Sequence, residues 1–256
     1  MKVVLTIAGS DSSGGAGIQA DLKTFEAFGV FGTSAITVLT AQNTTGVQSL
    51  LPLSVDFIEQ QIQSILSDFD VAAIKIGMLY DTDIIQMVHR IVSPLIIPIV
   101  LDPVCISKAG SPLLKDDAID ALRDLSRIVT LSTPNLHEAY RLFGYKADDT
   151  DSHAQIMQHR SPVLIKHHVM NTTTSDILYF GNKKQIFTAE MIDSTSQHGT
   201  GCSYSSAIAA SLALGLNLAA SIEKAKRFIT HAIDQAPHIG HGPGPINHKA
   251  GGDYVA

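Results

Sequence analysis

A glycine-rich segment that ends in a cysteine stands before an expected helix in the last quarter of the chain. Residues 197–202 read Gln-His-Gly-Thr-Gly-Cys. Glycines at a helix start let backbone N–H groups point outward in a row, and these donors together with the positive end of the helix can bind an anion. Cys202 lies in the first turn, where we expect its pKa to fall below about 8.5. A glycine-rich turn that leads into a buried helix would show the same pattern.

A second glycine-rich segment, residues 9–17, follows the first expected strand. Gly9 and Gly14 have the spacing of a P-loop, but the next two residues, Gly-Ala, replace the Lys-Ser/Thr pair that contacts phosphates. A dinucleotide-binding turn would need a carboxylate about 20 residues further on, and none stands there. We reject both interpretations. Two interpretations remain: the segment is a tight strand-to-helix turn, or it forms a wall against which a flat ligand packs. Asp21 lies one turn into the following helix and would face either that ligand or solvent.

Three oxygen-bearing side chains lie after two other expected strands. Asp102 ends one strand, and Asn135 and Glu138 have the i, i+3 spacing that places them on one face of a helix. Together they could hold Mg²⁺ through water, which suits an ion that keeps much of its hydration. Asn135 and Glu138 also form the pattern of a capping box, so the chemistry of a helix start explains them equally well.

The elements that must position these segments alternate along the chain. Apolar runs rich in β-branched residues predict strands buried on both faces at residues 3–8, 34–40, 71–76, 96–101, 128–131 and 163–166. Helical patterns cover residues 17–28, 55–68, 82–92, 116–125 and 135–143. This order predicts an α/β fold in which helices cover both faces of a mainly parallel sheet.

The rest of the chain predicts a hairpin of residues 175–180 and 183–188, helices at 201–214 and 218–235, and an irregular tail from Pro237. No repeat or linker marks a boundary, so we expect a single domain over residues 1–256. Ligands of open parallel sheets bind beyond the carboxyl ends of the strands. The loops that carry the polar motifs should therefore converge at one edge of the sheet.

Composition excludes several classes of protein. The 256 residues are 45% hydrophobic, which is too apolar for a disordered chain. Eighteen Lys+Arg against 24 Asp+Glu give a net charge of −6, which argues against nucleic acid or an anionic membrane as the main partner. The two cysteines do not suggest a disulfide framework and predict a reduced, cytoplasmic setting. No apolar segment is long enough to span a membrane.

The motifs together, in order and almost end to end, resemble the hydroxymethylpyrimidine/phosphomethylpyrimidine kinases of thiamine biosynthesis, which belong to the ribokinase-like superfamily. The segments that carry the resemblance are residues 5–25, 40–44, 75–79, 101–104, 133–136 and 198–202. The resemblance implies a three-layer ribokinase-like fold. It also implies a kinase that uses ATP and Mg²⁺ to phosphorylate 4-amino-5-hydroxymethyl-2-methylpyrimidine and then its monophosphate. Related kinases are often dimers, so it further implies a homodimer.

The resemblance also implies roles for particular residues. The positions around the pyrimidine are matched by Gly9, Asp21, Gln42, Met78 and Val104. The anion hole is matched by Gly199, Thr200, Gly201 and Cys202, with Cys202 where related sugar kinases carry a catalytic Asp. Lys166 matches a lysine near the nucleotide phosphates, so nucleotide binding falls to Lys166, Thr200 and Gly201. The Mg²⁺-linked region is matched by Asp102, Asn135 and Glu138.

Gln42 bears on the choice of substrate. Its amide offers C=O and NH₂ side by side, and an aminopyrimidine offers an amine beside a ring nitrogen, so the two can pair bidentately. A pyridine without the amine leaves half of the amide unpaired, which disfavours the alternative, a pyridoxine/pyridoxal kinase of the same fold. A non-catalytic pyrimidine-binding protein is a third hypothesis, because His167 and His168 stand where the family usually has Gly-Gly.

Cys202 should matter differently in the two phosphorylations. The first acceptor is an alcohol, which a base would help to deprotonate. The second acceptor is already a phosphate anion. We therefore expect Cys202→Ala to harm the hydroxymethyl step more than the monophosphate step.

Overall fold

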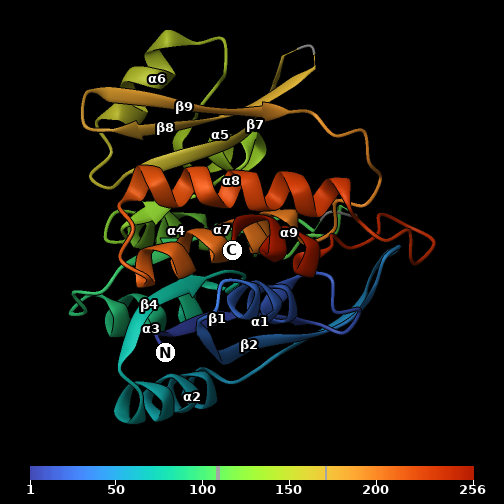
Figure 1. The fold of residues 1–256 in the computed structure, drawn as a ribbon. Helices are drawn as coiled ribbons and strands as arrows, with labels where there is room; N and C mark the ends of the chain where they lie inside the picture. The colour runs from blue at the N-terminus through green and yellow to red at the C-terminus, as the bar shows by residue number, and fades with distance from the viewer. Residues whose placement is uncertain (108–109, 171) are drawn as a thin grey trace.

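A nine-stranded sheet runs through the molecule in the computed structural model, which describes residues 1–107, 110–170 and 172–256 (Figure 1). The strands lie in the order β3-β2-β1-β4-β5-β6-β7-β8-β9. Their bounds are β1 Val3–Asp11, β2 Phe31–Asn43, β3 Gly46–Pro52, β4 Val71–Ile76, β5 Ile99–Leu101, β6 Leu131–Ser132, β7 Val163–Met170, β8 Thr173–Phe180 and β9 Lys183–Glu190.

The inner part of this sheet is parallel. Strands β2, β1, β4, β5, β6 and β7 pair in parallel, whereas β3 and the β8–β9 hairpin are added antiparallel at the two edges. The inner strands carry the apolar runs because helices cover both of their faces. The prediction of a mainly parallel sheet is confirmed, as is the hairpin.

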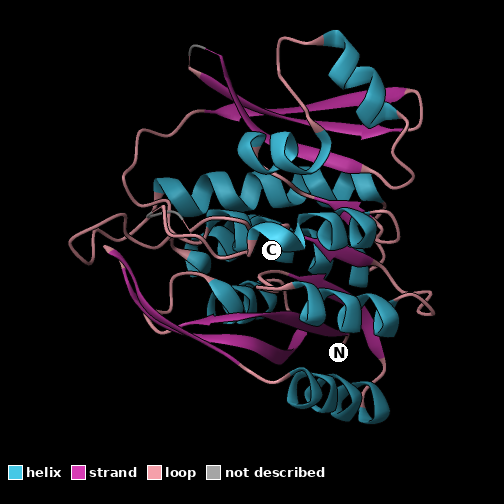
Figure 2. Ribbon diagram, turned by 180° about the vertical axis from the view of Figure 1, so that it is seen from behind, coloured by secondary structure: helices cyan, strands magenta, loops and turns pink. Residues whose placement is uncertain are grey.

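Two groups of helices form the outer layers (Figures 1 and 2). One core contains side chains of α1 (Gly17–Ala27), α7 (Thr200–Ala213), α8 (Leu218–Asp234) and α9 (His248–Val255). The other contains side chains of α2 (Val55–Asp68), α3 (Thr82–Val92), α4 (Ile119–Ser126, preceded by the 3-10 turn Asp116–Ala118) and α5 (Leu136–Phe143). Along β1, Val4 joins the first core, and Leu5 and Ile7 join the second. The expected three-layer arrangement is confirmed.

The structure differs from the sequence prediction where the local sequence pattern of a strand or helix is weak. The strand expected at residues 128–131 is the two-residue β6 (Leu131–Ser132), and β3 and α6 (Thr150–Met157) were not predicted. The tail that we expected to be irregular ends in α9, where Gly251 packs so closely on the Phe228 ring that an added Cβ would lie 2.8 Å from it. Tertiary packing therefore stabilises this helix despite its two glycines.

The β2–β3 hairpin projects beyond the layered body (Figure 2). The segment that precedes α9 reaches its tip, where the backbone N–H groups of His241 and Gly242 donate to Thr44 Oγ1 at 3.2 and 3.1 Å. This contact holds the hairpin above the carboxyl ends of the parallel strands. Among the described residues, no helix is both long and apolar enough to cross a membrane.

Candidate active site

A cavity of about 680 Å³ opens at the carboxyl ends of the parallel strands. Its walls come from the loops after β1, β4, β5, β6 and β9, from β2, β7 and β8, and from α8 and the start of α7. The predicted site residues that line it are Gly9, Gln42, Met78, Asp102, Val104, Asn135, Glu138, Lys166, Gly199, Thr200, Gly201 and Cys202. Segments nearly 200 residues apart therefore meet as expected from the sheet rule.

Asp21 does not line this cavity. Its carboxylate is fully buried behind the cavity wall, where it accepts hydrogen bonds from Thr6 Oγ1 at 2.6 Å and Ser206 Oγ at 2.7 Å and pairs with Lys75 Nζ at 2.8 Å. Lys75 itself lines the cavity. The pairing keeps the pKa of Lys75 raised although burial works against the charge. Asp21 thus acts on the cavity from behind its wall, through its ion pair with Lys75 and through its charge near Cys202.

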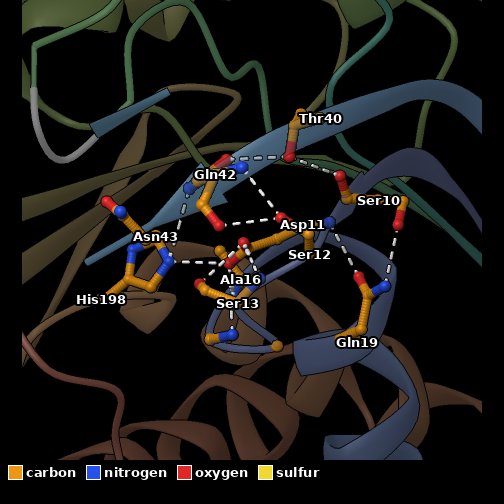
Figure 3. A network of polar contacts seen from close by, with 12 residues as sticks. Ser10, Asp11, Ser12, Ser13, Ala16, Gln19, Thr40, Gln42, Asn43 and His198 are labelled. Atoms are coloured by element: carbon orange, nitrogen blue, oxygen red, sulfur yellow. Dashed lines mark hydrogen bonds and ion pairs between the residues drawn. The ribbon is translucent and has the colours of Figure 1, made fainter. Parts of the chain in front are cut away.

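The loop after β1 is organised around the carboxylate of Asp11 (Figure 3). Asp11 Oδ1 accepts from the backbone N–H and the hydroxyl of Ser13, at 2.8 and 2.7 Å. Asp11 Oδ2 accepts from the N–H groups of Gly15 and Ala16, at 3.2 and 2.8 Å, and pairs with His198 Nε2 at 2.7 Å. We call these residues and Gln42, whose amide lies beside His198, the Asp11 network. It fastens the first glycine-rich loop to the second.

The start of α7 faces this loop. Gly199 precedes the helix with φ +82°, and a Cβ there would lie 1.8 Å from Gly15 O, so both the conformation and the close approach require glycine. Within the described chain, no side chain caps this helix start. The Thr200 N–H makes a long contact of 3.3 Å with the Gln197 carbonyl oxygen. The N–H groups that follow it in the first turn are available to a ligand, which supports the predicted anion hole.

Cys202, in the first turn of α7, does not have the lowered pKa that its helix position predicted. Burial raises the pKa of this thiol to about 11. The Lys75 charge lowers it, but the Asp21 and Asp102 carboxylates raise it further. The prediction of a pKa below about 8.5 is wrong because desolvation of the thiolate outweighs the helix dipole. In the free protein the Cys202 side chain is a neutral thiol at pH 7.

Lys166, at the end of the regular part of β7, pairs with the buried carboxylate of Asp102. Lys166 Nζ lies 2.7 Å from Asp102 Oδ1, which also accepts from Thr133 Oγ1 at 3.2 Å. Burial alone would lower the pKa of Lys166, but the Asp102 and Glu138 carboxylates raise it, so the ammonium stays charged. Gly201 adjoins this pair, since a Cβ there would lie 3.5 Å from Lys166 Nζ. A cation and open helix N–H groups thus face one part of the cavity.

Asn135 and Glu138 form the capping box that the sequence allowed. Asn135 Oδ1 accepts from the Glu138 N–H at 2.9 Å, and Glu138 Oε2 accepts from the Asn135 N–H at 2.9 Å. Burial raises the pKa of Glu138 to about 7, although the Lys166 charge works in the opposite direction. These two side chains are therefore already engaged in the start of α5.

This arrangement limits how Mg²⁺ could bind. Among residues 1–107, 110–170 and 172–256, no three His, Cys, Asp or Glu side chains gather to hold a metal ion. Asp102 and Glu138 do place two carboxyl groups at the cavity beside Lys166. This donor set fits an ion that keeps its water and takes few protein ligands, and it does not fit a closed cage of protein ligands.

A second carboxylate organises the far end of the cavity. Asp176 Oδ2 accepts from Lys226 Nζ at 2.7 Å and from the Tyr204 hydroxyl at 2.9 Å, and Asp176 Oδ1 accepts from the His167 N–H at 2.9 Å. His167, Asp176, Tyr204 and Lys226 all line the cavity, and we call them the Asp176 network. His167 itself adopts φ +68°, the conformation that glycine would take more easily. The left-handed backbone is therefore present even though a histidine stands there.

The sequence did not identify Asp11, His198, Asp176 and Lys226 as candidate site residues. Asp11 and His198 stand inside the glycine-rich motifs, so their position was a usable signal. Asp176 lies on β8 and Lys226 on α8, 50 residues apart, and no local pattern connects them. Only the fold shows that they form one network.

A three-layer ribokinase-like fold, with an open helix start and a buried lysine at one cavity, defines the protein as a kinase of small molecules. The family model described as "Phosphomethylpyrimidine kinase" matches residues 11–247. The chain belongs to this family.

Its relatives are similar over nearly their whole length. The hydroxymethylpyrimidine/phosphomethylpyrimidine kinase of Synechococcus elongatus is 41% identical, with 97% of each chain covered. A crystal structure of Bacillus subtilis pyridoxal kinase in complex with ADP is 37% identical, with a TM-score of 0.89 and 98% of each chain covered. The phosphomethylpyrimidine kinase of Clostridium difficile is 38% identical, with a TM-score of 0.79 over 91% of this chain and 100% of that one.

Proposed function

We propose that this protein uses ATP to phosphorylate 4-amino-5-hydroxymethyl-2-methylpyrimidine and then its monophosphate, as a kinase of thiamine biosynthesis. The single observation that carries the proposal is the shared cavity of Gln42 and the start of α7. Gln42 can recognise an aminopyrimidine, and the start of α7 can stabilise a transferring phosphoryl group. Phosphoryl transfer depends mostly on positioning and charge neutralisation, which this cavity supplies without a basic surface.

Each part of the cavity then has a role. Gln42 pairs with the amino group and ring nitrogen, while Gly9, Met78 and Val104 form walls around the ring. The N–H groups of Gly199, Thr200, Gly201 and Cys202 surround the phosphoryl group at the positive end of α7. Lys166 adds a fixed positive charge on the nucleotide side, together with Thr200 and Gly201. These interactions act on charge that develops during transfer, where fixed donors are most effective.

Mg²⁺ would lie near Asp102 and Glu138, held mainly through water and nucleotide oxygens, with Asn135 fixing the position of Glu138 through the capping box. When bound, the ion neutralises charge on the transferring phosphate. Asp102 in turn orients Lys166 through their 2.7 Å contact.

The alternative is a pyridoxal kinase, because the Bacillus subtilis structure with that name has a TM-score of 0.89. Gln42 favours the aminopyrimidine. An amide whose donor or acceptor stays unpaired in a closed site costs about 1–3 kcal/mol, or roughly five- to 150-fold in affinity. A pyridine without an amine would incur this cost.

A substrate panel tests the proposal. The release of ADP is measured with MgATP and hydroxymethylpyrimidine, its monophosphate or pyridoxal. We expect kcat/KM for hydroxymethylpyrimidine to exceed that for pyridoxal by roughly tenfold or more, and Gln42→Met to remove most of this difference. A preference for pyridoxal would assign the alternative function.

The expectations of a single domain over residues 1–256, a homodimer and a cytoplasmic setting belong to the same proposal. One sheet joins strands from residue 3 to residue 190, which supports a single cooperative unit. Both cysteines are free thiols, which supports a reduced setting. Light scattering coupled to gel filtration measures the mass, for which we expect twice the 27.3 kDa of one chain.

A further inference from the structure

Two contacts bear on which way the terminal amide of Gln42 faces. Gln42 Nε2 lies 3.5 Å from His198 Nε2, and Gln42 Oε1 lies 3.3 Å from Thr40 Oγ1 (Figure 3). The oxygen and nitrogen ends of an amide have nearly the same shape, so their partners decide which end is which. The chemistry of His198 and Thr40 therefore determines the orientation.

His198 can only donate from Nε2. This atom lies 2.7 Å from Asp11 Oδ2. Burial alone would raise the pKa of Asp11, but hydrogen bonds from His198, Ser13 and Ala16 lower it to about 2, so the carboxylate is ionised and only accepts. Nε2 must then carry a hydrogen, whatever the charge of the ring. The one hydrogen on Nε2 points at Asp11, so it is at most shared with Gln42 at 3.5 Å. An N–H group has no lone pair to accept from the Gln42 NH₂, so the amide oxygen is the end that fits beside His198.

Thr40 leads to the same orientation independently. Its hydroxyl donates to the carbonyl oxygen of Ser10 at 2.9 Å, and a carbonyl can only accept. The hydroxyl proton is therefore already used, and the hydroxyl oxygen presents lone pairs to Gln42. The end of the amide that faces Thr40 must then be the NH₂ group.

We propose that His198 and Thr40 are positioning residues that hold Gln42 with its oxygen towards His198 and its NH₂ towards Thr40, and that this orientation selects and aligns the aminopyrimidine. The inference rests on the proposed function. The ring amine then lies on the His198 side, and the ring nitrogen acceptor lies on the Thr40 side. A ring that presents these groups in the reverse order places donor against donor and acceptor against acceptor.

This alignment has a consequence for the reaction. In 4-amino-5-hydroxymethyl-2-methylpyrimidine, the amine stands between the ring nitrogen and the hydroxymethyl group. With the nitrogen on the Thr40 side and the amine on the His198 side, the hydroxymethyl group extends beyond His198. The next residue is Gly199, at the start of α7. The proposed orientation of Gln42 thus places the hydroxymethyl group on the side of His198 and Gly199, and the opposite orientation would place it on the side of Thr40.

Matched variants test this inference. His198→Met removes the donor, whereas His198→Gln keeps an N–H at a similar reach. Thr40→Val removes the hydroxyl, whereas Thr40→Ser keeps it. The measurements are the dissociation constant of hydroxymethylpyrimidine without nucleotide, by calorimetry, and kcat/KM for hydroxymethylpyrimidine and for pyridoxal.

We expect His198→Met to weaken hydroxymethylpyrimidine binding and to lower its preference over pyridoxal by about tenfold, as for the loss of one hydrogen-bond constraint. His198→Gln should stay within about threefold of the wild type, and KM for MgATP should change less than about twofold in both variants. Thr40→Val should also weaken hydroxymethylpyrimidine binding and lower the preference over pyridoxal, but by less than His198→Met does. Thr40→Ser should have the binding and the preference of the wild type.

Equal losses with both substrates, or a His198→Gln variant no better than His198→Met, would overturn the inference. If His198→Met fails to fold, the Thr40 pair decides by the same criteria. A wild-type protein that does not phosphorylate hydroxymethylpyrimidine would overturn the proposed function itself. An active wild-type protein whose preference is unchanged in every variant would overturn only the positioning role.

Discussion

The Asp11 and Asp176 networks both gather donors around one buried carboxylate, but the donors come from different places. Those of Asp11 are mostly backbone N–H groups and a hydroxyl within five residues, with His198 as the distant partner. Those of Asp176 are a lysine and a tyrosine from two helices and the N–H of His167. The first network folds a loop, and the second neutralises buried charge between elements.

The difference also appears in the backbone. In the loop that Asp11 organises, positive φ angles fall on glycines, such as Gly14 and Gly17. Beside Asp176 the positive φ falls on His167, where an L side chain is strained. The Asp11 side of the cavity is therefore built from locally suited residues, whereas the Asp176 side depends on long-range ion pairing.

The largest expected effect tests that dependence. Lys226→Met leaves the Asp176 carboxylate buried without its cation, and we expect a loss of about 3–5 kcal/mol in the free energy of unfolding, measured with urea. The control Lys183→Met, at an exposed position of β9, should change it by less than about 0.5 kcal/mol. Equal effects of the two variants would contradict a structural role for the buried pair.

An acid titration of stability tests the Asp11 network. Folding lowers the pKa of Asp11 from 3.8 to about 2. Its stabilisation is therefore complete above about pH 4 and is lost as the pH falls towards 2. At 1.36 kcal/mol per pKa unit, this amounts to about 2 kcal/mol. Urea unfolding between pH 5 and pH 2 should show the loss in the wild type but not in Asp11→Asn. The exposed control Glu26→Gln should follow the wild type.

Cys202 stands in the chain between His198 of the Asp11 network and Tyr204 of the Asp176 network, and its variant tests the chemistry rather than the stability. Because burial raises the thiol pKa to about 11, a thiolate base would become more available as the pH rises. We expect Cys202→Ala to reduce kcat of the hydroxymethyl step about tenfold more than that of the monophosphate step, and to remove the rise of the first rate with pH. Equal losses in both steps would instead make Cys202 a positioning residue.

The smallest expected effect concerns the strained residue. His167→Gly keeps the N–H that donates to Asp176 and relieves the left-handed strain, which should stabilise the protein by about 1 kcal/mol and raise Tm by about 2–4 °C. His168→Gly, at a position without positive φ, should be destabilising instead. A destabilised His167→Gly variant would show that the imidazole contributes more than its conformation costs.

The sequence predicted the elements and loops that carry strong local signals. The β-branched runs of β1 and β4 and the glycines before α7 indicated buried strands and an open helix start, and both are present. β3 and α9 were missed because an exposed edge strand and a glycine-containing helix form through pairing and packing, which no local pattern reports.

The candidate site shows the same division. The pattern of Asn135 and Glu138 allowed a cap or a metal ligand pair, and the structure shows the cap. Asp21 belongs to a recognisable motif, yet it lies behind Lys75 and away from the cavity. The pKa of Cys202 was predicted from its helix alone, and the burial that raises it arises only when distant parts of the chain pack together.

The sequence by itself therefore determined the layered α/β fold, the two glycine turns and many of the side chains that line the cavity, because hydrophobic periodicity and backbone freedom are local properties. Only the tertiary structure decided which charges pair, that the Cys202 thiol keeps its proton and which groups lie beside the Gln42 amide. These depend on desolvation and on hydrogen-bond partners that come from distant parts of the chain.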